Sequence, residues 1–160
     1  MVPPDATLGQ LHTVLQVAMG WGDSHLHEFS CGGRRFGPPD PEEDSGTADE
    51  NAEALSGVLG QVGAKVRYIY DFGDGWEHEI VLEKRLPADP KMVYPVCTAG
   101  KGACPPEDCG GLPGFYNLVE ALQDPDHPSH DELREWLGGE YDAGHFSIAD
   151  VNAKLARMKL

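Results

Sequence analysis

KVRYIYDFGDGWEHEIVLEKRL, residues 65–86, is the stretch that decides the fold. Apolar side chains take alternate positions before the glycine-rich turn, and the alternation resumes after it. The alternating positions are Val66, Tyr68, Tyr70, Phe72, Trp76, His78, Ile80 and Leu82. Such alternation is typical of strands with one buried and one solvent-facing side. The stretch therefore predicts an antiparallel hairpin whose aromatic row forms the floor of the hydrophobic core.

The turn sets the expected register of this hairpin. A three-residue loop over Gly73-Asp74-Gly75 places Phe72 opposite Trp76. The same register pairs Tyr70 with His78, so both apolar rows share one face, as burial requires. A two-residue turn is locally favourable, but it would split the rows between the two faces. We therefore predict the three-residue loop.

Helical and strand patterns flank the hairpin. Thr7 and Gln10 form a capping-box pattern at the start of a predicted helix over residues 7–20, and Gly20 is placed to end it. Residues 25–31 alternate like a strand and lead into a Gly32-Gly33 turn with a returning strand. Residues 38–53 carry seven acidic side chains, no basic one and three prolines. They predict an exposed loop without core-forming residues, followed by a short helix near residues 55–59.

The last third of the chain is predicted to be helical. Apolar spacing indicates one helix around residues 115–122, and Ser129 with Glu132 forms a capping-box pattern for the next. Ser147 is placed to cap a third helix. The 160 residues suit a single domain. The expected class is α+β, with a mainly antiparallel sheet packed against helices and a helical C-terminal third.

The charge balance excludes some partners. The chain has 27 acidic and 12 basic side chains, so its formal charge is −15. Nucleic-acid affinity comes largely from basic side chains on phosphates, so this charge argues against a nucleic-acid partner. The sequence has neither an 18-residue apolar span nor a signal-peptide pattern, which predicts a cytoplasmic protein without a membrane partner. Its four cysteines are then expected as thiols or metal ligands rather than disulfides.

Several blocks in order along the chain resemble a known family, the plasmid pRiA4b ORF-3-like proteins. These blocks are Thr7-Leu8 through Leu11-His12, Ala18-Met19-Gly20-Trp21, Asp23-Ser24-His25-Leu26-His27-Glu28-Phe29, Tyr70-Asp71-Phe72-Gly73-Asp74-Gly75-Trp76-Glu77-His78, Cys104-Pro105-Pro106-Glu107-Asp108-Cys109-Gly110-Gly111 and Trp136-Leu137-Gly138-Gly139. The resemblance implies a compact α+β domain whose biochemical role is not established. Resolvase or repressor labels carried by some members are not transferred, because a serine recombinase needs a basic DNA surface.

One departure from the family pattern concerns the N-terminus. Family members usually begin with an additional strand before the segment that matches Val2-Pro3-Pro4-Asp5, and this sequence starts at Met1. We expect either an upstream start or a version lacking that strand. A missing strand would leave an unpaired sheet edge, which predicts a homo-oligomer formed through that edge.

The first candidate for chemistry is a zinc site. Cys97, Cys104 and Cys109 have the spacing C-x6-C-x4-C. Zinc in proteins takes about four nitrogen or sulfur ligands, but this spacing matches neither a knuckle nor a finger. The alternative, which we favour, is that the thiols pack as small hydrophobic groups in a loop rich in glycine and proline.

The second candidate is the hairpin turn. Asp71, Asp74 and His78 lie close in sequence and could bind a cation or form a base beside a carboxylate. The favoured alternative is turn chemistry, in which aspartate accepts local backbone hydrogen bonds. His25 and His27 are two residues apart, which places them on one face of the predicted strand and suits a shared ligand.

The third candidate is the acidic loop ahead of the C-terminal helices. Glu107 and Asp108 stand between a proline pair and a glycine pair. They could present carboxylates to a ligand or cap the following helix.

These observations favour a non-catalytic binding module with an unknown protein or small-molecule partner. The alternative is a metal-dependent enzyme, hydrolytic in type, that uses Asp71, Asp74, His78 and the cysteines. A DNA-associated protein ranks third because of the charge. No cofactor is assigned, and zinc is the one candidate.

Overall fold

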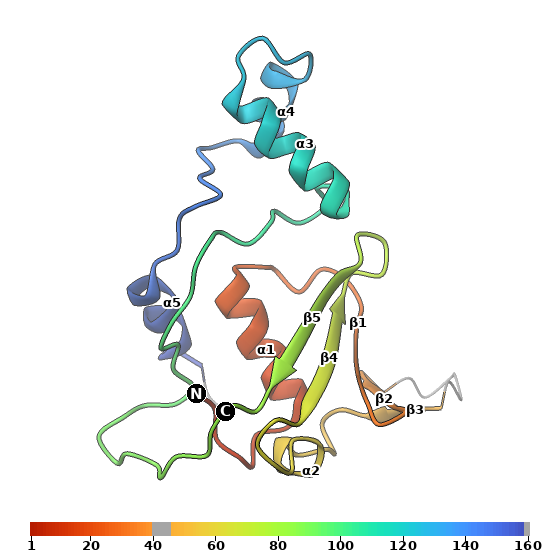
Figure 1. Cartoon of the computed structure of the whole chain (residues 1–160), viewed down its shortest axis with the longest axis vertical. Coiled ribbons are helices and arrows are strands. Elements are labelled where there is room, and N and C mark those ends of the chain that lie inside the picture. Colours follow the sequence, from red (N-terminus) through yellow and green to blue (C-terminus); the bar gives the residue numbers. More distant parts are fainter. Residues whose placement is uncertain (40–45, 159–160) are drawn as a thin grey trace.

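The computed structural model describes residues 1–39 and 46–158. Figure 1 shows a sheet with a helix across one face and a helical lobe that projects beyond one end of the sheet. The elements in chain order are α1 (Leu8–Met19), β1 (His27–Cys31), β2 (Arg34–Gly37), β3 (Thr47–Asp49), α2 (Leu55–Val58), β4 (Lys65–Tyr70), β5 (Trp76–Val81), α3 (Gly111–Gln123), α4 (His130–Leu137) and α5 (Ile148–Leu155).

Five strands form one sheet in the order β3-β2-β1-β4-β5. The pairs β2–β1, β1–β4 and β4–β5 are antiparallel, and β2–β3 is parallel. This sheet and the helices around it confirm the predicted α+β class and the helical C-terminal third. β3 and β5 are the edge strands among the described residues. Self-association through a sheet edge stays a prediction.

The hairpin has the predicted faces but a different register. Tyr70 pairs with Trp76 and Tyr68 with His78, so the loop spans residues 71–75 and the predicted three-residue loop is wrong. The error is a shift of two residues, which keeps every side chain on its predicted face. Asp71 ends β4 because it takes a φ of 56° and donates its N–H to Leu26. Phe72 is consequently exposed rather than part of the core row.

The core lies between the sheet and α1. Phe29, Tyr68 and Tyr70 are fully buried on the sheet face that carries Leu8 and Leu11 of α1. Trp76 is also buried, and Ile80 packs against this cluster, as expected if the aromatic row forms the floor of the core. A smaller cluster joins Val14 of α1 to α5 through Val151 and Leu155.

The predicted caps are formed at two of the three helices. Thr7 and Gln10 make the reciprocal capping box of α1, and Gly20 ends that helix in the left-handed conformation. Ser147 accepts a hydrogen bond from the Asp150 N–H at the start of α5. At α4, Ser129 occupies the N-cap position without a side-chain cap bond, so the predicted box with Glu132 is absent there.

The acidic segment 38–53 is more structured than predicted. Residues 40–45 lie outside the described residues, but residues 47–49 form β3 beside β2. Glu50 then turns inward and is only 5% exposed. The expectation of an exposed loop without interior residues was therefore wrong for its second half. None of the described helices has the length and apolar content needed to cross a membrane.

Candidate functional site

A histidine and two aspartates converge where the sheet meets the α3–α4 lobe. His25 lies in the loop before β1, Asp71 follows β4, and Asp108 lies in the loop before α3. The His25 Nε2 atom is 3.1 Å from Asp108 Oδ1 and 3.7 Å from Asp71 Oδ2. Three segments that are distant in sequence thus supply one nitrogen and two oxygen atoms, all within 4.8 Å of one another. We call these three residues the His25 centre.

The geometry of the His25 centre does not fit an internal hydrogen bond. The Nε2 atom is buried and has no hydrogen-bond partner among the described residues, although both carboxylates are close. Two ligand atoms bound to one ion at about 2.1 Å lie about 3.0 Å apart in an octahedron and about 3.4 Å apart in a tetrahedron. The observed separations of 3.1 and 3.7 Å lie near this range. Ligand atoms that surround a common metal ion are expected to lie this close to one another without being aligned for a hydrogen bond.

The backbone holds Asp71 in position. Its Oδ1 atom accepts hydrogen bonds from the N–H groups of Gly73 at 2.9 Å and Asp74 at 3.3 Å. The other oxygen, Oδ2, is the one that faces His25. Asp71 is 7% exposed and, like Asp108, has a positive φ, which is uncommon outside glycine. The turn chemistry predicted for Asp71 is therefore present, and it orients the carboxylate toward His25.

Glu107 supports the wall of the centre rather than capping α3. The Tyr70 hydroxyl donates to Glu107 Oε1 and accepts from the Ser24 N–H at 3.0 Å. Glu107 Oε2 accepts from the Gly22 N–H at 3.0 Å. Burial, and to a smaller extent the hydrogen bond to Glu107, raises the pKa of Tyr70 to about 12. Gly110 is the N-cap of α3 and no side chain caps it, so the predicted capping role of Glu107 or Asp108 was wrong.

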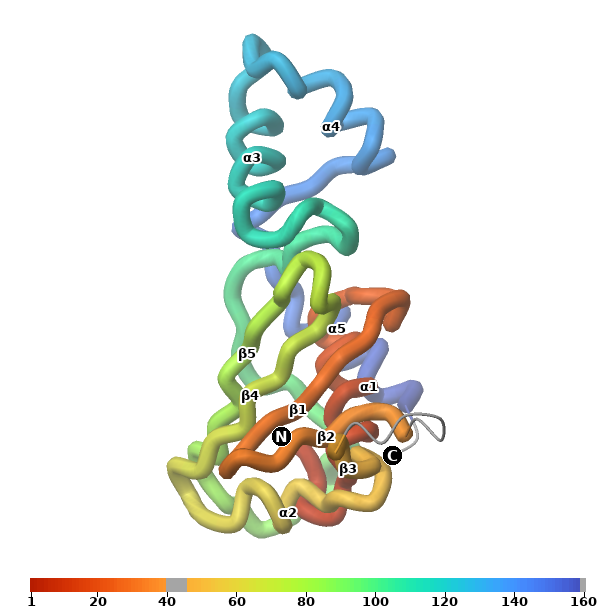
Figure 2. The backbone as a smooth tube through the Cα atoms, turned by 90° about the vertical axis from the view of Figure 1, so that its right-hand side faces the viewer, coloured from red at the N-terminus to blue at the C-terminus, as the bar shows by residue number. Residues whose placement is uncertain are grey.

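The hairpin tip is fixed against the start of α3. Asp74 Oδ2 accepts a hydrogen bond from the Gly110 N–H at 3.2 Å. Gly111 has a φ of +64°, and a Cβ atom there would lie 2.6 Å from the Asp74 carbonyl oxygen. Only glycine allows this approach. The glycine pair thus joins the lobe to the sheet beside the His25 centre, and Figure 2 shows the lobe continuing beyond the hairpin tip.

A second histidine group lies under α1. The rings of His12 and His27 stack in parallel, with centroids 3.5 Å apart and an interplanar angle of 4°. His12 Nε2 is 2.8 Å from Asp23 Oδ1, and His27 Nε2 is 2.8 Å from Glu50 Oε2. Both histidines are buried. We call the two histidines the stacked pair, and Asp23 and Glu50 are their carboxylate partners.

A closed ring of hydrogen bonds fixes the tautomer of His12. The Gln16 side-chain Nε2–H donates to the Tyr68 hydroxyl at 3.1 Å. Its Oε1 atom accepts a hydrogen bond from the Asp23 N–H at 3.0 Å. The Tyr68 hydroxyl is 2.9 Å from His12 Nδ1. Because the Asp23 carboxylate only accepts, His12 Nε2 carries the proton and the hydroxyl donates to Nδ1. The neutral imidazole satisfies every member of the ring.

The stacked pair is a poorer metal site than the His25 centre. His12, Asp23 and His27 also bring ligand atoms within 4.8 Å of one another. The lone pairs of parallel rings do not converge, however, and both Nε2 atoms already have carboxylate partners. We therefore assign the stacked pair a structural role in the core.

Stability is expected to fall as the pH drops below neutral because His12 is held neutral. Burial and the neighbouring His27 lower the pKa of His12, and burial lowers the pKa of His78. A folded-state pKa below the unfolded value of about 6.5 means that the unfolded chain binds more protons as the pH falls through that value. Stability should therefore rise between pH 5.5 and 7 and level off above. Urea unfolding of metal-free protein across this range measures the effect.

His12→Gln should reduce the pH dependence, and the exposed His145 offers a matched control in His145→Ala. An unchanged slope in His12→Gln would contradict this explanation.

Some of the candidate residues from the sequence lie together in the structure, and others lie apart. The structure brings together His25, Asp71 and Asp108. His25 precedes β1, whereas His27 is the first residue of that strand, pairs with Tyr70 and contacts Glu50, so the two histidines do not share a ligand. His78 lies 3.1 Å from the Trp76 carbonyl oxygen through Nδ1 and is outside the His25 centre.

The three cysteines of the candidate zinc site do not meet at one point. Cys97 packs with the α1–α5 cluster, and Cys104 and Cys109 pack against the main core. Among the described residues, neither group that could hold a metal contains a cysteine. Burial raises the pKa of Cys104 to about 12 and that of Cys109 to about 11, which keeps both protonated at neutral pH. This geometry fits the packed thiols that the sequence favoured.

Sequence reasoning missed His12, Asp23 and Glu50. His12 lies next to Leu11 in the apolar stripe of α1, where a polar residue that shares a buried face signals an internal partner. Glu50 was hidden within an acidic run that resembles a solvated loop. Asp23 carries the third positive φ among the non-glycine residues, a feature that the sequence does not reveal.

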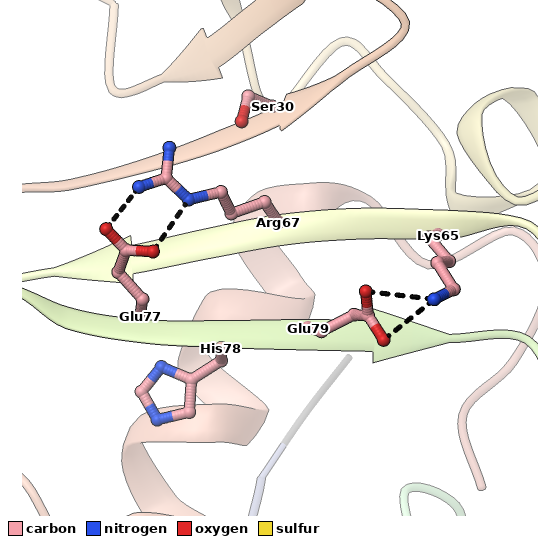
Figure 3. A pocket seen from close by; sticks show the side chains of 6 residues that line it. All are labelled: Ser30, Lys65, Arg67, Glu77, His78 and Glu79. Carbon is pink, nitrogen blue, oxygen red and sulfur yellow. Dashed lines mark hydrogen bonds and ion pairs between the residues drawn. The ribbon is translucent and has the colours of Figure 1, made fainter.

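A surface hollow of about 460 Å³ lies elsewhere, over the open face of the sheet. Figure 3 shows Lys65 directed to Glu79 and Arg67 to Glu77, with His78 on the other side of the strand. These exposed ion pairs contribute little stability. Because both cations already have carboxylate partners, we do not assign an anion site there.

The fold and the His25 centre define an α+β domain with a histidine–aspartate group between a sheet tip and a helical lobe. The chain belongs to the plasmid pRiA4b ORF-3-like protein family, which it matches over residues 1–150. It is 44% identical over 166 residues to the uncharacterized protein y4hQ of Sinorhizobium fredii (strain NBRC 101917 / NGR234), covering 98% of this chain and 85% of that protein.

A crystal structure supports the same fold. The protein of unknown function MM3350 from Methanosarcina mazei Go1 has a TM-score of 0.83 and 36% identity, over 93% of this chain and 85% of that chain. Both relatives are described as uncharacterised or of unknown function, so they assign no specific activity.

Proposed function

We propose that the protein is a metal-binding domain that holds one divalent transition-metal ion through His25, Asp71 and Asp108. The observation that carries the proposal is the buried Nε2 atom of His25, which lies beside two carboxylate oxygens and has no hydrogen-bond partner in the part of the chain that the structure describes. A buried polar atom without a partner is costly, and a bound ion would satisfy it.

The ligand set indicates the type of ion. One imidazole nitrogen and two carboxylate oxygens suit zinc, manganese or iron(II), whereas a thiolate site would favour softer ions. The interaction of Asp71 Oδ1 with two backbone N–H groups is the kind of second-shell support that orients metal ligands.

Three protein ligands would leave coordination positions open. Open positions distinguish catalytic from structural zinc sites, since they admit water or a substrate oxygen. Asp108 has a side chain that is 70% exposed, so solvent reaches the centre. Hydrolysis is the reaction class that such an ion supports.

Metal binding without catalysis is the second candidate, and the contacts of Glu107 favour it. This carboxylate is the acidic side chain next to Asp108, but Tyr70 and the Gly22 N–H already occupy both of its oxygens. A general base needs a free acceptor within reach of the attacking water. Binding of the proposed ion therefore accounts for the geometry without a catalytic reaction.

Titration of metal-free, untagged protein with Zn²⁺, Mn²⁺ or Co²⁺ tests metal binding. We expect one ion per chain with a Kd below about 10 μM for zinc. The ¹⁵N resonance of His25 Nε2 should shift, while those of His12, His27 and His78 should keep their positions.

The absence of stoichiometric binding would contradict the proposal. So would binding that shifts His12 and His27 instead of His25, or that quenches the cysteine thiols.

A further inference from the structure

A second hollow, of about 230 Å³, lies between α3 and α4. Its walls combine carboxylates, an amide, an indole ring and aliphatic side chains, from Asp108, Asn117, Leu118, Glu132, Leu133 and Trp136. None of the residues that line it is basic. A volume below the usual 300–1,000 Å³ of ligand pockets restricts the occupant to a small molecule or a single side chain.

We propose that this hollow binds a primary ammonium group carried on a short aliphatic stem. This ligand is separate from the proposed metal ion, and the hollow contains neither His25 nor Asp71. Asp108 belongs to both sites, so a molecule in the hollow lies beside the proposed ion.

The charges in the hollow favour a cation. The side chain of Glu132 makes no hydrogen bond or ion pair with any described residue, so its carboxylate is available to a ligand. Asp108 adds a second negative charge, and among the described residues its carboxylate pairs with His25 alone. The formal charge of −15 on the whole chain also attracts cations toward the surface.

The apolar walls select an organic cation over a bare ion. Trp136 is a large aromatic side chain that remains 47% exposed although it lines the hollow. An ammonium group within about 6 Å of an indole ring is attracted by its π face, and tryptophan is the strongest partner of this kind. Leu118 and Leu133 supply aliphatic contact for the stem.

Binding of n-butylammonium, followed by methyl and side-chain amide resonances of the lobe, tests this inference. n-Butanol is the neutral control and n-butyrate the control of opposite charge. We expect n-butylammonium to bind at least about tenfold more tightly than either control, with an affinity that falls as salt is added. A peptide with one lysine, compared with free n-butylammonium, distinguishes a protein side chain from a free amine as the source.

Two variants locate the binding. Glu132→Gln and Trp136→Leu should each weaken n-butylammonium binding by about fivefold or more. Asp131→Asn is a matched control, because Asp131 also lies in the first turn of α4 but does not line the hollow. Equal binding of the three probes, or full binding by both variants, would overturn the inference.

The same titration in metal-free and metal-loaded protein separates this inference from the proposed function. A bound ion would neutralise Asp108, so n-butylammonium should bind several-fold more weakly to the loaded form. Metal binding without n-butylammonium binding overturns only the inference. n-Butylammonium binding to a protein that takes up no metal supports the inference and rejects the proposed metal site.

Discussion

Replacing His27 with alanine is expected to lower the free energy of unfolding by about 3–5 kcal/mol, because it leaves a buried carboxylate without its partner. His27 and Glu50 have side chains that are each 6% exposed, and their contact is 2.8 Å long. Solvent therefore cannot replace the lost hydrogen bond. The alanine also removes the ring that stacks on His12. Urea denaturation monitored by tryptophan fluorescence measures the change.

Two further variants separate the carboxylate effect from the loss of packing. Glu50→Gln keeps an acceptor for the His27 N–H and removes the charge, so it should cost less than His27→Ala. A double variant, His27→Phe with Glu50→Leu, should also be less destabilised than His27→Ala, since it leaves no buried polar group unpaired. A loss below about 1.5 kcal/mol for His27→Ala would show that the Glu50 carboxylate finds another partner.

The elements of the fold could be predicted from sequence where the signal is local. The capping box of α1 depends on side chains three residues apart, and both hydrogen bonds are present. The buried face of the β4–β5 hairpin follows from alternation, which a shift of two residues does not alter. The predicted register was wrong because the Asp71 N–H donates to the carbonyl oxygen of Leu26. Leu26 lies just before β1, far from Asp71 in sequence. Alternation contains no information about that contact.

The sequence identified the individual residues of the candidate site, but it did not predict that these three would meet. The sequence marked His25 as one of two histidines on a predicted strand face, Asp71 as a turn residue and Asp108 as part of an acidic loop. Their meeting depends on the β1–β4 pairing and on the contact of Gly110 and Gly111 with the hairpin tip. These are long-range contacts that no local pattern encodes. The same reason explains why His27, although two residues from His25, contacts a different carboxylate.

Asp71→Asn is expected to weaken metal binding by at least about a hundredfold, more than the 10- to 100-fold typical of losing an outer-shell partner. The asparagine oxygen can still accept the Gly73 and Asp74 N–H groups, so the turn is preserved. Asparagine also tolerates the φ of 56° that the turn requires. The amide would place an N–H₂ group where Oδ2 faces His25, which removes both the lone pair and the charge. The stability of metal-free protein should change by less than about 1 kcal/mol.

Asp74→Asn is the matched control for this variant, since Asp74 lies in the same turn and bonds to the Gly110 N–H but is outside the His25 centre. It should bind the metal within about threefold of the unmodified protein, a difference of less than 0.7 kcal/mol on the scale of about 1.4 kcal/mol per tenfold. Asp71→Ala, which also loses both turn hydrogen bonds, should lose metal binding and stability together. If Asp71→Asn retained the affinity of Asp74→Asn, the carboxylate of Asp71 would serve the turn alone, and His25 would be a half-buried histidine rather than a metal ligand.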